Sequence, residues 1–114
     1  MKILRIIAPI FFLLTTVEIA AAQTDTIRIQ TSAICNQCKK IIENDLSFEK
    51  GVRKSSLDVS SGMLTVVYNP AKTDAAKIRQ AVTKSGYDAD SIPADPKAYK
   101  HLPDCCKLPE KHNE

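Results

Sequence analysis

The chain has 114 residues, 44% of them hydrophobic, and a formal net charge of +3, which suits one domain with a core of its own. This charge is too near balance to predict a nucleic-acid partner or binding to a membrane surface, and we expect a monomer. Four cysteines, all in the region after residue 22, are the chemically distinctive residues: Cys35, Cys38, Cys105 and Cys106.

Residues 1–22 have the pattern of a secretory signal peptide. Lys2 and Arg5 form a basic start, residues 6–17 are apolar, and Ala20-Ala21-Ala22 offers small residues for cleavage. The apolar run is about twelve residues long, short of the ~20 that a membrane-spanning helix needs. We therefore expect an exported protein, periplasmic or extracellular, with no stable membrane insertion after cleavage.

The first half of the remaining chain predicts a strand followed by a helix. Residues 26–33 alternate between apolar and polar side chains, as a half-buried strand does. Residues 37–48 have helical spacing instead, and Gly51 ends this segment. The face that we expect this helix to bury carries Cys38, Ile41, Ile42, Asp45 and Leu46.

The second half predicts a hairpin, a second helix and a last strand. Residues 52–59 and 63–68 form two strands around a turn at Gly62. A helix follows, capped by Thr73 or Asp74, with a buried stripe of Ala75, Ile78, Ala81 and Val82. Residues 87–92 are a short fourth strand. This order predicts an α+β, ferredoxin-like βαββαβ sandwich, in which two helices cover one face of a four-stranded antiparallel sheet.

Residues 93–114 form a proline-rich C-terminal tail beyond the domain of residues 23–92. Asp95 followed by Pro96 is a helix start signal, so about two helical turns are expected over residues 97–102. The pair Cys105-Cys106 comes next.

The motif Cys35-Asn36-Gln37-Cys38 lies where the first strand gives way to the first helix. Both sulfurs would lie near a helix N-terminus, whose partial positive charge favours the thiolate. A thiolate pair on a short loop either binds a soft metal ion or exchanges with disulfides. The residues alone leave these two chemistries open.

Residues 26–92 resemble the heavy-metal-associated domain of metallochaperones and metal-pumping ATPases. The matching pieces are the Cys-X-X-Cys motif after the first strand, Gly51-Val52, Tyr68-Asn69-Pro70 and Ser85-Gly86-Tyr87-Asp88. The resemblance implies a binding protein rather than an enzyme. It also implies near-linear binding of Cu(I) or Hg(II), and transfer to a metal-transporting membrane protein or another acceptor by thiolate exchange.

Within this resemblance, Cys35 and Cys38 match the two metal-binding thiolates of the family. Tyr87 matches an aromatic position that flanks the metal loop, with ordinary packing as the alternative role. One position departs from the family. Ala33 stands where the family usually has a buried methionine, which predicts a looser loop but removes no ligand.

Cys105 and Cys106 lie outside the resembled region. As supplementary ligands they would complete a shell of three or four sulfurs, which suits Zn(II), Cd(II) or a Cu(I) cluster. A disulfide, free thiols or contact with a partner are the alternatives. His101, four residues before Cys105, is a further candidate ligand.

Two other classes of protein compete with metal transfer. One is a periplasmic thiol-disulfide oxidoreductase that uses the same cysteine motif, and the other is a small interaction domain with an inert disulfide. The Asn-Gln pair between the cysteines and the absence of tryptophan both argue against a thioredoxin-like enzyme. The predicted strand order leaves no room for a thioredoxin sheet.

Overall fold

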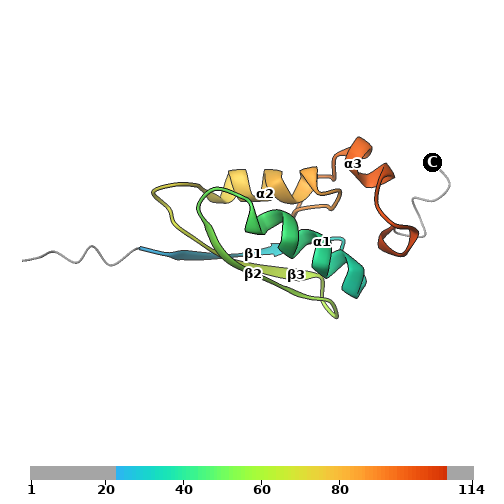
Figure 1. Cartoon of the computed structure of the whole chain (residues 1–114), viewed down its shortest axis with the longest axis horizontal. Helices are drawn as coiled ribbons and strands as arrows, with labels where there is room; N and C mark the ends of the chain where they lie inside the picture. The colour runs from blue at the N-terminus through green and yellow to red at the C-terminus, as the bar shows by residue number, and fades with distance from the viewer. Residues whose placement is uncertain (1–22, 108–114) are drawn as a thin grey trace, which may run out of the picture.

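The computed structural model describes residues 23–107, so the predicted signal segment 1–22 and the end of the tail lie outside the described residues. Two layers make up the domain, with α1 and α2 on one face of the sheet and a C-terminal segment at one end (Figure 1). The elements in chain order are β1 (Asp25–Gln30), α1 (Asn36–Ser47), β2 (Val52–Asp58), β3 (Met63–Tyr68), α2 (Ala75–Lys84), α3 (Pro96–Lys100) and the 3-10 turn η1 (Asp104–Cys106).

The sheet is antiparallel in the order β1-β3-β2, with the most apolar strand in the middle. Ile29 of β1 and Leu57 of β2 both lie opposite Leu64 of β3, and all three side chains are buried. Alternate residues of β3 face the helices, as its sequence predicts. The predicted hairpin is confirmed, since β2 and β3 pair directly.

The predicted fourth strand over residues 87–92 is wrong, because the described sheet has three strands. This segment makes only single bridges, between Thr31 and Ala89 and between Ala89 and Ile92. The chain reverses at Asp90, whose φ of 52° is left-handed, and the amides of Ala89 and Ile92 each bond the other residue's carbonyl at 2.9 Å. A chain that turns back on itself here cannot continue as an extended strand.

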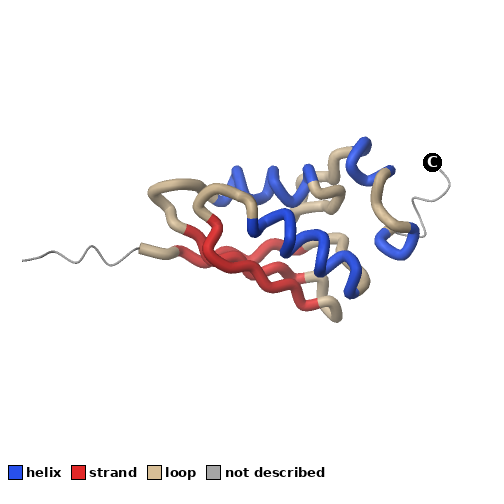
Figure 2. Tube along the Cα trace, viewed as in Figure 1, coloured by secondary structure: helices blue, strands red, loops and turns tan. Residues whose placement is uncertain are grey.

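Both long helices lie over the same face of the sheet (Figure 2), and each has one row of buried side chains. In α1 the buried residues are Cys38, Ile42 and Leu46, at a spacing of four. Asp45, expected on this stripe, is exposed because the buried face is narrower than the pattern suggests. Asp74 caps α2 by accepting a hydrogen bond from the Lys77 amide at 2.8 Å. The buried residues of α2 are Ile78, Ala81, Val82 and Thr83.

The C-terminal segment packs against the end of α2. Asp95 caps α3, as predicted, but α3 ends at Lys100 and not at residue 102. Leu102 is buried over Gly86, where an added Cβ would lie 3.0 Å from the leucine Cγ and Cδ1 atoms. The Asp95 amide also bonds the Thr83 carbonyl at 3.0 Å. The segment is therefore anchored to the domain on both sides of α3.

Asp90 links the end of β1 to α2, so we expect its loss to destabilise the fold. Its carboxylate accepts from the Gln30 amide at 2.9 Å and pairs with Arg79 Nε at 2.8 Å. Asp90→Ala should lower the free energy of unfolding by about 1–2 kcal/mol at pH 7. Urea unfolding monitored by circular dichroism measures this change.

The effect of Asp90 should also depend on pH. Hydrogen bonds from Arg79 and from the Gln30 amide hold the pKa of Asp90 below its ordinary value. A lowered carboxyl pKa gives stability that is present at neutral pH and is lost as the pH falls through the folded-state value. The difference between wild type and Asp90→Ala should thus shrink at pH 3. Asp90→Asn is the control, because asparagine also tolerates a left-handed backbone and keeps one hydrogen-bond acceptor. Equal stability of Asp90→Ala and wild type at pH 7 would contradict the prediction.

Candidate metal site

Cys35 lies at the N-terminus of α1, at the end of the loop that leaves β1. Its backbone is extended, with φ −148° and ψ 168°, and its carbonyl accepts from the Lys39 amide at 3.1 Å. The Thr31 hydroxyl donates to the Gly62 carbonyl at 2.7 Å and accepts from the Ala33 amide at 3.2 Å. Ala33, at the position of the methionine in the family pattern, is buried, and its amide joins the loop to Thr31.

The structure brings all four cysteines together around Cys35. Its sulfur lies 3.1 Å from that of Cys38, 3.5 Å from that of Cys106 and 3.8 Å from that of Cys105. The Cys105 and Cys106 sulfurs are 3.9 Å apart. Cys38 and Cys106 are buried, Cys35 is half-buried and Cys105 is exposed. All four are free thiols, so the two predicted pairs form one thiol cluster.

The spacing of Cys35 and Cys38 is that of a reduced, hydrogen-bonded pair. A disulfide would bring the sulfurs to about 2.05 Å. An ion in linear coordination, at roughly 2.3 Å from each sulfur, would hold them about 4.6 Å apart. The observed 3.1 Å lies between these values. The pair therefore has to open to take an ion between its two sulfurs.

The surroundings of Cys35 lower the pKa of its thiol. Burial works against its thiolate, but hydrogen bonds from the Cys38 thiol and amide, and then from the tail thiols, lower the pKa of Cys35 to about 7. Hydrogen bonding to Cys35 raises the pKa of Cys105, and burial raises that of Cys106. Within the cluster the pKa of the Cys35 thiol is thus lowered, whereas those of the two tail thiols are raised.

Tyr87 is fully buried beside the thiol cluster. Burial, and then the neighbouring thiols of Cys106 and Cys38, raise its pKa. Its hydroxyl has no hydrogen-bond partner within residues 23–107. The adjacent Asp88 amide donates to Ser32 Oγ at 2.9 Å, which joins this segment to the loop before Cys35. Tyr87 therefore packs in the core, and its unpaired hydroxyl lies next to the sulfurs of Cys106 and Cys38.

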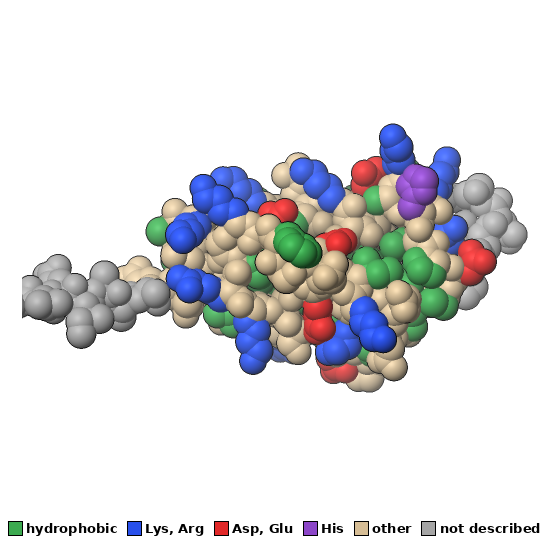
Figure 3. Space-filling model, viewed as in Figure 1, with side chains coloured by type: hydrophobic (Ala, Val, Ile, Leu, Met, Phe, Trp, Pro, Cys, Tyr) green, Lys and Arg blue, Asp and Glu red, His purple; other side chains and the backbone are tan. Residues whose placement is uncertain are grey.

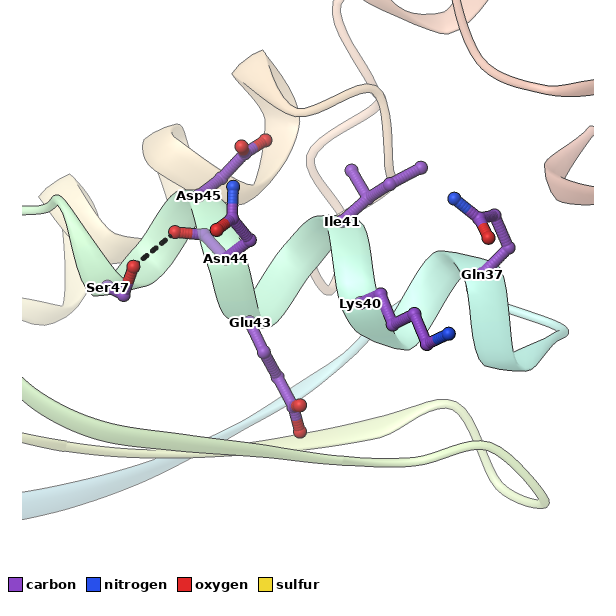
Figure 4. A pocket seen from close by; sticks show the side chains of 7 residues that line it. All are labelled: Gln37, Lys40, Ile41, Glu43, Asn44, Asp45 and Ser47. Atoms are coloured by element: carbon purple, nitrogen blue, oxygen red, sulfur yellow. Dashed lines mark hydrogen bonds between the residues drawn. The ribbon is translucent and has the colours of Figure 1, made fainter.

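A surface hollow on the outer side of α1 is separate from the thiols. Figure 4 shows its lining side chains, none of which is a cysteine. Glu43 points from this helix toward the sheet, where it accepts from the Leu57 amide at 3.0 Å. Lys39 pairs with Glu43 at 3.0 Å and donates to the Leu57 carbonyl at 3.0 Å. Lys39 and Glu43 therefore fasten α1 to β2.

His101 is exposed and is not part of the group of close ligands. Among residues 23–107, the side chains whose ligand atoms all lie within 4.8 Å of one another are Cys35, Cys105 and Cys106.

Sequence reasoning overlooked Leu102, which anchors the segment that carries the tail thiols. An apolar residue within a polar, proline-rich stretch was the available signal.

Comparison with known families agrees with a thiol-based metal site. The model of the family described as the heavy-metal-associated domain matches residues 29–88, more than half of the chain. The chain belongs to this family. The matched region includes Cys35, Cys38 and Tyr87, whereas the tail thiols lie beyond it.

Curated relatives are metal-transporting ATPases and copper chaperones. The chain is 32% identical over 76 residues to a cation-transporting ATPase of Oryza sativa subsp. japonica, covering 63% of this chain and 8% of the ATPase. It is 28% identical over 54 residues to the copper chaperone CopZ of Staphylococcus aureus, covering 47% of this chain and 79% of the chaperone. This heavy-metal-associated chain thus spans less than a tenth of the ATPases it matches.

Solved structures of similar fold include a copper binding domain of a P-type ATPase and the mercury-bound form of MerP. Oxidized MerP from Ralstonia metallidurans CH34 has a TM-score of 0.57 at 23% identity, covering 60% of this chain and 96% of MerP. The soluble region of the Bacillus subtilis ATPase CopA has a TM-score of 0.56 at 29% identity, covering 60% of this chain and 46% of that chain. The predicted fold class is therefore confirmed, with three strands in the described sheet where four were predicted.

Charged side chains of both signs lie on the face shown in Figure 3. Lys and Arg side chains spread along this face, with Asp and Glu among them over its middle. Hydrophobic side chains, a class that includes cysteine in this view, gather toward the end where the C-terminal segment lies. Within residues 23–107, no helix has the length and apolar character needed to cross a membrane.

Proposed function

We propose that this heavy-metal-associated protein is exported and carries a soft metal ion, Cu(I) or Hg(II), on Cys35 and Cys38. It passes the ion to a metal-transporting membrane protein, or to another acceptor, by thiolate exchange. In this role the protein binds and transfers, and it catalyses no reaction. The N-terminal pattern of residues 1–22 supports export to the periplasm or the extracellular space.

One observation carries the proposal, namely the half-buried thiol of Cys35 at the centre of three other thiols. Its lowered pKa of about 7 supplies the deprotonated sulfur that a metal needs as ligand. Soft thiolates select soft ions, which favours Cu(I) and Hg(II) over Mg(II) or Ca(II). The same donor set also admits Zn(II) or Cd(II) when more than two sulfurs take part.

Anaerobic titration of the reduced protein with Cu(I), Hg(II) and Zn(II), in competition with a chelator, tests the proposal. Wild type should bind one ion tightly, and Cys35→Ser combined with Cys38→Ser should lose that binding. Cys105→Ser combined with Cys106→Ser removes the same number of thiols but keeps Cys35 and Cys38, so it should bind the ion more tightly than the Cys35/Cys38 variant. Metal binding by the Cys35/Cys38 variant as tight as that of wild type would refute the proposal.

A thiol-disulfide oxidoreductase is the competing function, favoured by the 3.1 Å approach of Cys35 to Cys38. Reduction of insulin disulfides measures this activity. Metal transfer predicts negligible turnover together with tight metal binding. Rapid turnover without metal affinity would favour the oxidoreductase instead. Lack of both activities would favour the small interaction domain.

A further inference from the structure

We infer that the C-terminal segment of residues 93–107 is part of the metal site, and that Cys35, Cys105 and Cys106 hold the ion in three-sulfur coordination. This inference rests on the proposed function and refines it: Cys35 and Cys38 hold the ion during transfer, and Cys35 with the two tail thiols holds it before an acceptor is met. The third and fourth thiols lie outside the region that matches the heavy-metal-associated family, which ends at residue 88. The three-sulfur site is therefore an addition made by this chain.

The spacing of the three sulfurs is the first support. Their separations of 3.5, 3.8 and 3.9 Å form a nearly equilateral triangle. An ion in the plane of this triangle would lie about 2.2 Å from each sulfur, close to the ~2.3 Å of a metal–thiolate bond. The three thiols can take an ion with little movement, whereas the pair of Cys35 and Cys38 has to open first.

The docking of the tail is the second support. Cys106 is 1% exposed and belongs to the same buried cluster as Cys38 and Tyr87. Leu102 fills the space over Gly86, and the tail is also held by a hydrogen bond of 2.8 Å from the Ala94 amide to the Asp88 carboxylate. η1 contacts α1, and its cysteines approach Cys35 at the N-terminus of that helix. These contacts set the thiols in place before any ion arrives.

Cys38 then has a different role from that of the tail thiols. Its sulfur is buried and lies beside that of Cys35. Cys38 can therefore take over as a metal ligand when Cys105 and Cys106 move away with the tail. The ion would rest on Cys35 with the two tail thiols, and would move to Cys35 and Cys38 when an acceptor displaces residues 93–107. Cys35 belongs to both ligand sets.

X-ray absorption spectroscopy of the Cu(I)-loaded and Hg(II)-loaded full chain tests the inference, because it counts the sulfur ligands. Wild type should show three sulfurs. Cys105→Ser combined with Cys106→Ser should show two, and its affinity should fall by about 10²-fold when one thiolate ligand is lost. Leu102→Asn keeps all four thiols but loosens the tail, so it should also weaken binding, and circular dichroism checks that each variant is folded.

The outcomes separate this inference from the proposed function. Two sulfurs in wild type, with unchanged affinity in the Cys105/Cys106 variant, overturn the three-sulfur site while leaving transfer by Cys35 and Cys38 intact. Tight binding by the Cys35/Cys38 variant overturns the proposed function itself. Affinity that falls in the Cys105/Cys106 variant but not in Leu102→Asn would overturn the role of tail docking.

Discussion

Cys35→Ser should weaken metal binding far more than Cys38→Ser does. Cys35 lies within 3.8 Å of all three other sulfurs and belongs to both ligand sets, whereas Cys38 approaches Cys35 and lies outside the converging group of three. Structural zinc sites gain ~10–16 kcal/mol from four ligands, or roughly 2.5–4 kcal/mol per ligand. We expect a loss of about 10²- to 10³-fold for Cys35→Ser and about tenfold for Cys38→Ser.

Competition titration of the two single variants against a Cu(I) chelator measures the difference. Serine at position 38 still offers a hydroxyl donor to the Cys35 thiolate, so Cys38→Ser perturbs the pKa of Cys35 less than alanine would. Equal losses in the two variants would contradict the prediction, and would show that Cys35 and Cys38 hold the ion alone.

Tyr87→Phe should stabilise the metal-free protein and weaken metal binding. The Tyr87 hydroxyl is buried without a hydrogen-bond partner in the described structure, so its removal should raise the free energy of unfolding by about 1–2 kcal/mol. Once an ion binds, the neighbouring sulfurs become thiolates, which accept hydrogen bonds from such a donor. Loss of that donor should lower the affinity by about tenfold.

Urea unfolding of the metal-free protein and chelator competition measure the two effects separately. Tyr68→Phe is the matched control, because Tyr68 is also a buried tyrosine and the substitution makes the same chemical change. Tyr68 pairs with Asp25, at the opposite end of β1 from the loop that leads to Cys35. A Tyr87→Phe protein with unchanged affinity would assign Tyr87 to packing alone.

The predictable parts of this molecule depend on patterns that are local in sequence. The change from period two to helical spacing placed Cys35 and Cys38 at the strand–helix junction, and the alternation over residues 63–68 identified the central strand. The buried stripe of α2 followed from the same reasoning. Each of these features is determined by residues that are close to one another in the sequence.

The parts that could not be predicted depend on contacts between distant residues. Residues 87–92 have a strand-like sequence, but the Asp90 side chain bonds Gln30 and Arg79 and holds the chain in a turn. The approach of Cys106 to Cys35 depends on Leu102 filling the space that Gly86 leaves open. Sequence reasoning showed that the tail was long enough to reach the site, and the contact with Gly86 determines where it packs.

The anchor at Leu102 has a consequence for competition at the metal site. Only two residues separate it from Cys105, so the tail thiols stay near Cys35 at an effective concentration of at least the millimolar order reached by short tethers. Free small-molecule thiols must exceed that concentration to displace Cys105 and Cys106 as ligands of the ion. An acceptor that detaches residues 93–107 removes this protection in one step. Detachment of the tail, and not the exchange of sulfur ligands, should then limit the rate at which the ion is handed over.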